Sequence, residues 1–210
     1  TAVNGMLRDY GLEPLTAERV ASHVGKGARN LVTRCLEDRG RANQDDEAIS
    51  AALRVFEQHY DQHLLDTTRP FPGLLPLLAS LSGRGERMGV VTNKPAGFSR
   101  HILRALELEP HFAALVGGDS TPRRKPDPEP LRVALRDLGI ELDQVAPEDR
   151  SRRLLMVGDT PIDIESARNA GIRSLGVSWG FATREVLATA TPDRIVDDVD
   201  QLAAALDDPA

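Results

Sequence analysis

From residue 68 to the C-terminus, apolar residues alternate between short continuous runs and stripes with helical spacing. The runs predict strands, and the stripes, whose members recur every three or four residues, predict helices. The predicted strands span residues 88–92, 113–116, 154–157, 174–177 and 194–196, and the predicted helices span residues 74–81, 98–106, 131–138, 161–170 and 199–206. This alternation predicts an α/β fold with a parallel sheet covered on both faces. Functional side chains of such sheets collect at the carboxyl ends of the strands.

Residues 14–67 have a different pattern, because they are polar, helical in spacing and free of strand-like apolar runs. We interpret them as a small α-helical insert in an α/β core formed by residues 1–13 and 68–210. One helix face near the N-terminus is formed by Val3, Met6, Leu7 and Tyr10. We expect a strand of about 5–6 residues and its connecting loop to precede this helix.

The composition is ordinary for a globular protein, with 40% hydrophobic and 28% charged residues among 210. The formal net charge of -6 argues against nucleic acid or an anionic membrane as the partner. No apolar run approaches the ~18 residues of a membrane-spanning helix. Because Cys35 is the single cysteine, no intrachain disulfide can form, and we expect a reducing, cytoplasmic location. The oligomeric state is not indicated.

The segment Thr92-Asn93-Lys94-Pro95 follows the first of these strands and opens the next helix. Free backbone N–H groups at a helix start favour an anion, and a hydroxyl and an amide side chain stand beside them. The same residues also suit an ordinary helix cap with proline near the first turn. An anion site and a purely structural turn are therefore both open here.

Lys125 lies in the loop that leads to the helix begun by Asp127 and Pro128. Pro126 confines Lys125 to extended geometry, so its ammonium can point away from the helix and toward a pocket. A solvated basic loop, which would include the neighbouring Arg123 and Arg124, explains the same segment without any site.

The segment Gly158-Asp159-Thr160-Pro161-Ile162-Asp163 carries the sharpest chemical signal. Asp159 stands at the tip of a buried strand, where a carboxylate needs a charge partner and can take a hard cation. Asp163 falls at the third position of the following helix, where a capping box with Thr160 explains it without a metal. The case for a metal therefore depends more on Asp159 than on Asp163.

In this order and spacing, these three segments resemble the second, third and fourth motifs of the haloacid dehalogenase superfamily. The resemblance extends from about residue 68 to the C-terminus, and the helical insert resembles the superfamily's type-1 cap. Within the superfamily, the loop Val24-Gly25-Lys26-Gly27-Ala28-Arg29 and the tetrapeptide Thr-Asn-Lys-Pro are similar to those of phosphoglycolate phosphatases. The resemblance implies a Rossmann-like core with a small helical cap.

The resemblance also implies a magnesium-dependent phosphatase for a small phosphorylated metabolite, 2-phosphoglycolate above all, that works through an aspartyl-phosphate. It assigns catalytic roles to Thr92 and Lys125, the Mg²⁺ site to Asp159 with support from Asp163, and substrate binding to Asn93, Lys26 and Arg29. Thr92 would donate to a phosphate oxygen, and Lys125 would offset negative charge. Lys26 and Arg29 would meet the substrate carboxylate as the cap closes.

The superfamily's first motif, Asp-x-Asp-x-Thr/Val at the end of a strand, supplies the nucleophile and the general acid/base, and it is absent from this sequence. The nearest match, Asp198-Val199-Asp200, lacks the Thr/Val and opens an amphipathic helix, where exposed acids suit the helix dipole. The resemblance places the true motif just upstream of Thr1. We therefore expect the 210 residues by themselves to be inactive.

Three other functions stay open: a metal-independent haloacid dehalogenase, a β-phosphoglucomutase-like mutase or sugar-phosphate phosphatase, and a non-catalytic protein that keeps the scaffold. The acids at 159 and 163 argue against the first of these. His59 and His63 lack nearby ligands at a telling spacing, and Cys35 lacks a recognisable histidine partner. We interpret His59 and His63 as parts of a polar helix face and Cys35 as a small buried residue.

Overall fold

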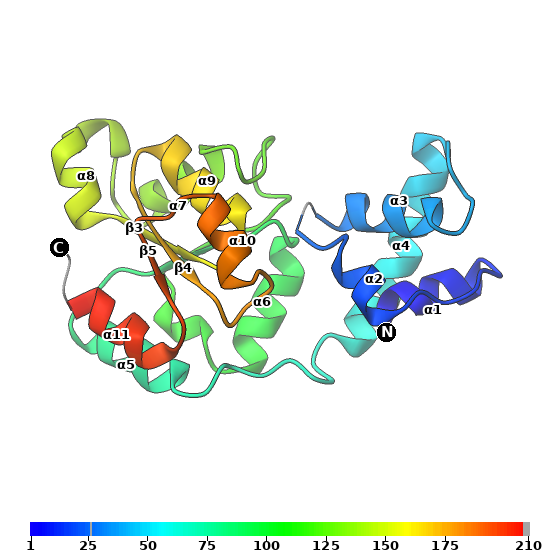
Figure 1. Ribbon diagram of the computed structural model, residues 1–210, viewed down its shortest axis with the longest axis horizontal. Coiled ribbons are helices and arrows are strands. Elements are labelled where there is room, and N and C mark those ends of the chain that lie inside the picture. Colours follow the sequence, from blue (N-terminus) through cyan, green and yellow to red (C-terminus); the bar gives the residue numbers. More distant parts are fainter. Residues whose placement is uncertain (26, 208–210) are drawn as a thin grey trace. The chain divides into compact units, whose positions relative to one another are not determined.

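The computed structural model describes residues 1–25 and 27–207 (Figure 1). The chain divides into two compact units, Thr1–Arg69 and Pro70–Ala210. We call them the helical unit and the α/β unit, and each is described by itself.

The helical unit contains α1 (Ala2–Asp9), α2 (Ala17–Ala21), α3 (Ala28–Glu37) and α4 (Asp46–His63). Side-chain caps satisfy backbone N–H groups at two of the helix starts. Thr16 accepts a hydrogen bond from the Arg19 amide, and Asp45 accepts one from the Ala48 amide. Local sequence therefore determines where α2 and α4 begin.

Helix α1 belongs to the core of the helical unit, whereas the sequence analysis assigned residues 1–13 to the α/β core. Met6 and Leu7 are fully buried, together with Val32 and Cys35. These side chains pack where α1 lies against α3 and α4. The sequence revealed the apolar face of α1 but not the surface that this face covers.

The α/β unit contains every strand and helix predicted for residues 68–210, with ends that agree within two residues. Its strands are β1 (Gly89–Val91), β2 (Ala114–Val116), β3 (Leu155–Gly158), β4 (Arg173–Val177) and β5 (Arg194–Val196). Its helices are α5 (Leu74–Gly83), α6 (Ala96–Ala105), α7 (Glu129–Asp137), α8 (Pro147–Arg153), α9 (Pro161–Ala170), α10 (Arg184–Thr189) and α11 (Val199–Asp207), with short 3-10 turns η1 (Glu109–His111) and η2 (Leu142–Gln144). Helices α8 and α10 were not predicted, because both are short and lack an apolar stripe.

All strand pairs are parallel, which confirms the predicted fold class. The strands form two ladders, β1–β2 and β3–β4–β5, instead of the single sheet that we expected. Val90 lies opposite Leu115 in the first ladder, and Val157 lies opposite Leu175 in the second. Within the described residues, β1 and β3 each pair with one neighbour and are edge strands.

One hydrophobic cluster joins the two ladders. Helix α7 contacts β1 and β2, while α9 contacts β3 and β4, and the two helices contact each other. Leu131 of α7 and Ala167 of α9 are buried in this cluster, against which Val91 and Met156 pack from the strands. Figure 1 also shows α5 beside α11, below the strands. The carboxyl ends of β1 and β3 are thus held by a shared helical layer.

None of the helices in residues 1–25 and 27–207 combines the length and the apolar character needed to cross a membrane.

Replacing Leu7 by alanine should destabilise the helical unit by about 2–5 kcal/mol, because it removes a fully buried side chain and leaves a cavity. Residue-resolved hydrogen exchange should show lower protection in α1, α3 and α4 and unchanged protection in β3 and β4. Arg8→Ala, on the exposed face of the same helix, serves as the control and should change stability by less than about 0.5 kcal/mol. Equal effects of the two substitutions would contradict the assignment of α1 to this core.

Candidate active site

The turn from β3 into α9 is built around the carboxylate of Asp163. Its Oδ2 accepts hydrogen bonds from the amides of Asp159 (3.1 Å) and Thr160 (3.0 Å) and from the Thr160 hydroxyl (2.8 Å). Thr160 is the N-cap of α9, Pro161 stands at its first position and Asp163 at its third, so the predicted capping box is present. Gly158 is required beside it, because a Cβ there would lie 2.2 Å from Asp163 Cβ.

Lys125 is buried against the same carboxylate. Its Nζ lies 2.7 Å from Asp163 Oδ1 and 2.6 Å from the carbonyl oxygen of Val91. The two side chains are only 8% and 9% exposed. The structure therefore excludes the solvated basic loop for Lys125 and ties the loop before α7 to the ends of β1 and β3.

Thr92 lies between two residues that contact Lys125. The Val91 carbonyl accepts from Lys125 Nζ, and Asn93 Nδ2 donates to the Lys125 carbonyl at 3.0 Å. The Thr92 hydroxyl accepts a hydrogen bond from the Lys94 amide at 3.1 Å. Thr92, Asn93 and Lys125 thus share one end of the α/β unit. This agrees with the tendency of functional side chains to collect at the carboxyl ends of parallel strands.

The loop after β2 packs closely against the loop after β1 and hydrogen-bonds to it. The sequence analysis did not predict this contact. Asp119 accepts from the Ala96 amide at 2.8 Å, so this N–H at the start of α6 already has an anionic partner. A Cβ at Gly117 would lie 2.3 Å from Ala96 N, and a Cβ at Gly118 would lie 2.2 Å from Asn93 O. The Gly-Gly-Asp sequence directly after a strand was the signal that could have revealed this contact.

Asp159 is partly buried at the tip of β3, and its carboxylate is held from the loop after β4. Oδ2 accepts a hydrogen bond from the Phe181 amide at 2.9 Å. Burial raises the pKa of the Asp159 carboxyl above its ordinary value, while the Phe181 amide and, more weakly, Lys125 act in the opposite direction. The sequence analysis predicted Asp159 as a site residue but missed its partner in residues 178–182.

The donor set fits a hard cation in chemical type but offers few ligands. Asp159 provides carboxylate oxygen, which Mg²⁺ prefers. Both oxygens of Asp163 are engaged by Lys125, Thr160 and the Asp159 amide, so this residue is placed to orient the turn. No cluster of three or more His, Cys, Asp or Glu suited to a metal occurs in the part of the chain that the structure describes.

The predicted substrate-binding residues of the cap loop lie apart from this network in the chain, and their role stays a prediction. Lys26 falls outside the described residues. Arg29 forms an ion pair with Asp46 and donates a hydrogen bond to Ser50 at 3.1 Å, which joins the start of α3 to α4. Before the loop, His23 lies 2.9 Å from the carboxylate of Asp38, which follows α3, and Arg19 Nε donates to the same carboxylate at 2.7 Å. Both ends of residues 24–28 are therefore anchored within the helical unit.

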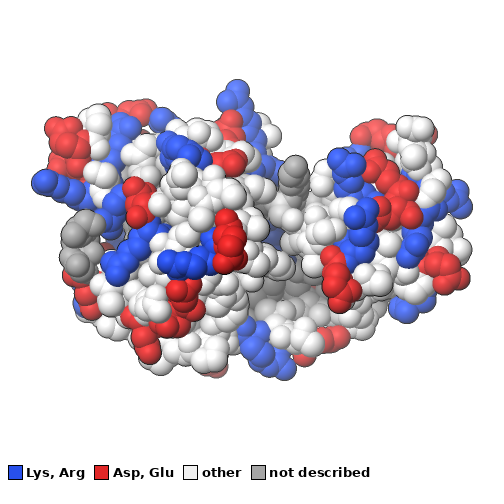
Figure 2. All heavy atoms as spheres, in the orientation of Figure 1, with Lys and Arg blue, Asp and Glu red and all other residues white. Residues whose placement is uncertain are grey.

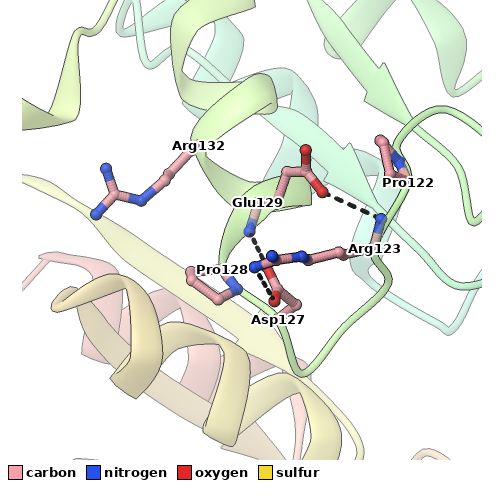
Figure 3. A pocket seen from close by; sticks show the side chains of 6 residues that line it. All are labelled: Pro122, Arg123, Asp127, Pro128, Glu129 and Arg132. Carbon is pink, nitrogen blue, oxygen red and sulfur yellow. Dashed lines mark hydrogen bonds and ion pairs between the residues drawn. The ribbon is translucent and has the colours of Figure 1, made fainter.

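A surface hollow of about 530 Å³ lies beside the start of α7 (Figure 3). Its lining includes Arg123, Asp127, Glu129 and Arg132, and it includes neither Lys125 nor Asp159. Arg123 pairs with Asp127, and Arg132 pairs with Asp143, so the basic groups are already neutralised. Figure 2 likewise shows acidic and basic side chains intermixed over the visible surface. Neither view reveals a concentrated anion-binding face.

Comparison with known proteins identifies the family. Residues 1–177 match the haloacid dehalogenase-like hydrolase family. The chain belongs to this family. The resemblance drawn from the three sequence segments is thereby confirmed.

Several relatives in this family are phosphoglycolate phosphatases. The chain is 40% identical to that of Rhodospirillum rubrum over 200 residues, which cover 94% of this chain and 79% of the relative. It is 36% identical to that of Neisseria gonorrhoeae over 198 residues, covering 93% and 80% of the two chains. A crystal structure of a predicted phosphoglycolate phosphatase from Haemophilus somnus superimposes with a TM-score of 0.84 at 27% identity, covering 97% of this chain and 88% of the other.

Replacing Lys125 by methionine should destabilise this haloacid dehalogenase-like fold by about 3–5 kcal/mol, because it leaves the Asp163 charge buried without its partner. The free energy of unfolding, measured with urea, checks this. The double variant Lys125→Met/Asp163→Asn should recover part of the loss, giving a favourable coupling in a double-mutant cycle. Costs that simply add would show that the two side chains act independently.

The anchor before the cap loop should depend on pH. Hydrogen bonds from Arg19 and His23 hold the pKa of the Asp38 carboxyl well below its usual range, so the stability it provides is present above the unfolded value of about 3.9 and is lost as pH falls further. Asp38→Asn should therefore lower the urea midpoint of the helical unit at pH 7. The difference from the parent should shrink below about pH 4, and a difference that grows on acidification would contradict this account.

Proposed function

We propose that the chain forms most of a magnesium-dependent phosphatase that hydrolyses a small phosphorylated metabolite, with 2-phosphoglycolate as the favoured substrate. The observation that carries the proposal is the buried contact of Lys125 with Asp163 at 2.7 Å, where Asp163 also accepts a hydrogen bond from the Asp159 amide. A lysine ammonium and a carboxylate at the carboxyl ends of β1 and β3 suit phosphoryl transfer, because this reaction depends on positioning and charge neutralisation. Phosphoglycolate phosphatases among the relatives support the substrate class.

Each site residue takes a role that its contacts allow. Asp159 would hold Mg²⁺, and bound Mg²⁺ would neutralise charge on the phosphoryl group. Asp163 orients the Asp159 turn through the amides it accepts from. Lys125 offsets negative charge near the nucleophile, and the Thr92 hydroxyl donates to a phosphate oxygen.

The nucleophile in this proposal is an aspartate on a strand that precedes Thr1, and it would form the aspartyl-phosphate. Two observations support it. The edge strands β1 and β3 can each accept a further parallel strand, and Val91 and Met156 of these strands pack on one cluster. The carboxyl end of a strand inserted there would meet Lys125 and Asp159. On this proposal, the 210 residues without that segment do not turn over substrate.

A cytoplasmic setting fits the proposal, because the single cysteine, Cys35, is buried and free.

The mutase and sugar-phosphatase alternatives share this core chemistry and differ in the substrate. Comparing activity toward 2-phosphoglycolate and toward hexose phosphates separates them from a 2-phosphoglycolate phosphatase. A metal-independent dehalogenase would stay active in EDTA, whereas the proposed phosphatase would lose its activity.

The decisive experiment uses the enzyme expressed with the segment that we propose precedes Thr1, which we call the extended enzyme. Asp159→Asn in this enzyme should lower phosphate release from 2-phosphoglycolate by about 100-fold or more, because it removes a charged metal ligand. Its far-UV circular dichroism should match the parent. EDTA should abolish the parent activity, and Mg²⁺ should restore it.

Asp149→Asn, on the exposed surface of α8, is the matched control and should keep parental activity. Substantial turnover by Asp159→Asn would refute the metal assignment. Turnover of 2-phosphoglycolate by the 210 residues without the added segment would refute the location of the nucleophile.

A further inference from the structure

The turn that follows β4 holds Asp159 at three points. The Phe181 amide donates to Asp159 Oδ2 at 2.9 Å, and the Ala182 amide donates to the Asp159 carbonyl at 3.1 Å. Gly180 fits directly against the carboxylate, because a Cβ there would lie 2.2 Å from Oδ2 and 2.3 Å from Asp159 Cβ. Residues 178–182 therefore contact both the backbone and the side chain of the proposed metal ligand.

Gly180 is needed for space and not for backbone freedom. Its φ lies outside the left-handed region, where glycine is favoured for conformational reasons. The atoms that a Cβ would strike belong to one side chain, that of Asp159. Alanine at position 180 can be accommodated only if the carboxylate or the turn moves.

The turn itself has a fixed base. Trp179 packs against the cluster that contains Val177 and Val196. Its ring also meets Phe71 edge to face, with ring centroids 6.4 Å apart. Phe181, by contrast, is a 72% exposed residue. The contribution of Phe181 to Asp159 is therefore its backbone N–H and not its side chain.

We infer that Gly180 and the Phe181 amide are positioning groups that fix the Asp159 carboxylate, which would hold a divalent cation, and that they do so by holding its Oδ2. This inference rests on the metal role of Asp159 in the proposed function. Partners that orient a metal ligand typically change metal affinity or activity by about 10- to 100-fold when they are removed. Residues 180 and 181 thus set cation affinity without contacting the cation.

Two substitutions at position 181 separate the amide from the ring. Phe181→Ala keeps the N–H donor, whereas Phe181→Pro removes it. In the extended enzyme, Phe181→Pro should weaken Mn²⁺ binding, measured by electron paramagnetic resonance, by about 10- to 100-fold. Phe181→Ala should bind Mn²⁺ like the parent. Equal affinities of these two variants would overturn the inference.

Substitution at position 180 tests the space requirement. Gly180→Ala should raise the Mg²⁺ concentration needed for half-maximal activity by about 10-fold or more. Gly83→Ala, where a Cβ at the end of α5 meets nothing within 4 Å, should leave it unchanged. In an Asp159→Asn background, Gly180→Ala should cause no further loss of Mn²⁺ affinity, because its effect passes through the Asp159 carboxylate.

The outcomes distinguish this inference from the proposed function. Equal Mn²⁺ affinity of the parent and Asp159→Asn would overturn the metal role of Asp159, and with it the positioning role. Binding that depends on Asp159 but not on the Phe181 N–H would overturn the positioning role only. If Gly180→Ala does not fold, the comparison of Phe181→Pro with Phe181→Ala still decides.

Discussion

Lys125 and Asp163 form an ion pair that is almost closed to water, and it connects the loop before α7 to the first turn of α9. Taking two charges out of water costs several kcal/mol per ion. Further hydrogen bonds offset part of that cost, because Asp163 accepts from Thr160 and the Asp159 amide while Lys125 also donates to the Val91 carbonyl. The pair thereby couples the ends of β1 and β3, which belong to different ladders. Asp159 takes its position from this network as well as from β3.

Much of the α/β unit could be predicted from sequence because its signals are local. The capping box of Thr160 and Asp163 and the left-handed Gly171 that ends α9 are encoded within a few residues of the structures they determine. Thr92, Lys125 and Asp159 were then predicted to lie close together because each follows a strand, and the carboxyl ends of parallel strands share one edge of a sheet. Local patterns plus one topological rule were sufficient for these residues.

The features that sequence reasoning missed depend on contacts between distant segments. The apolar face of α1 gave no indication that it covers α3 and α4. The division of the strands into two ladders depends on which strands lie side by side, and hydrophobic runs carry no such information. The Phe181 amide reaches Asp159 across 22 positions through a backbone atom that every residue except proline possesses.

Several close contacts among the loops of this site depend on glycine. A Cβ at Gly117, Gly118, Gly158 or Gly180 would come within 2.3 Å of an atom in the same or a neighbouring turn. Such approach lets backbone amides of one loop reach the side chains or carbonyls of the next, as Phe181 does with Asp159 and Gly118 with Lys94. Side chains provide the chemistry of this site, but the places where side chains are missing determine how closely its loops can meet. The glycines at the ends of β2 and β3 and in the loop after β4 are therefore as informative about the site as its acids and lysine.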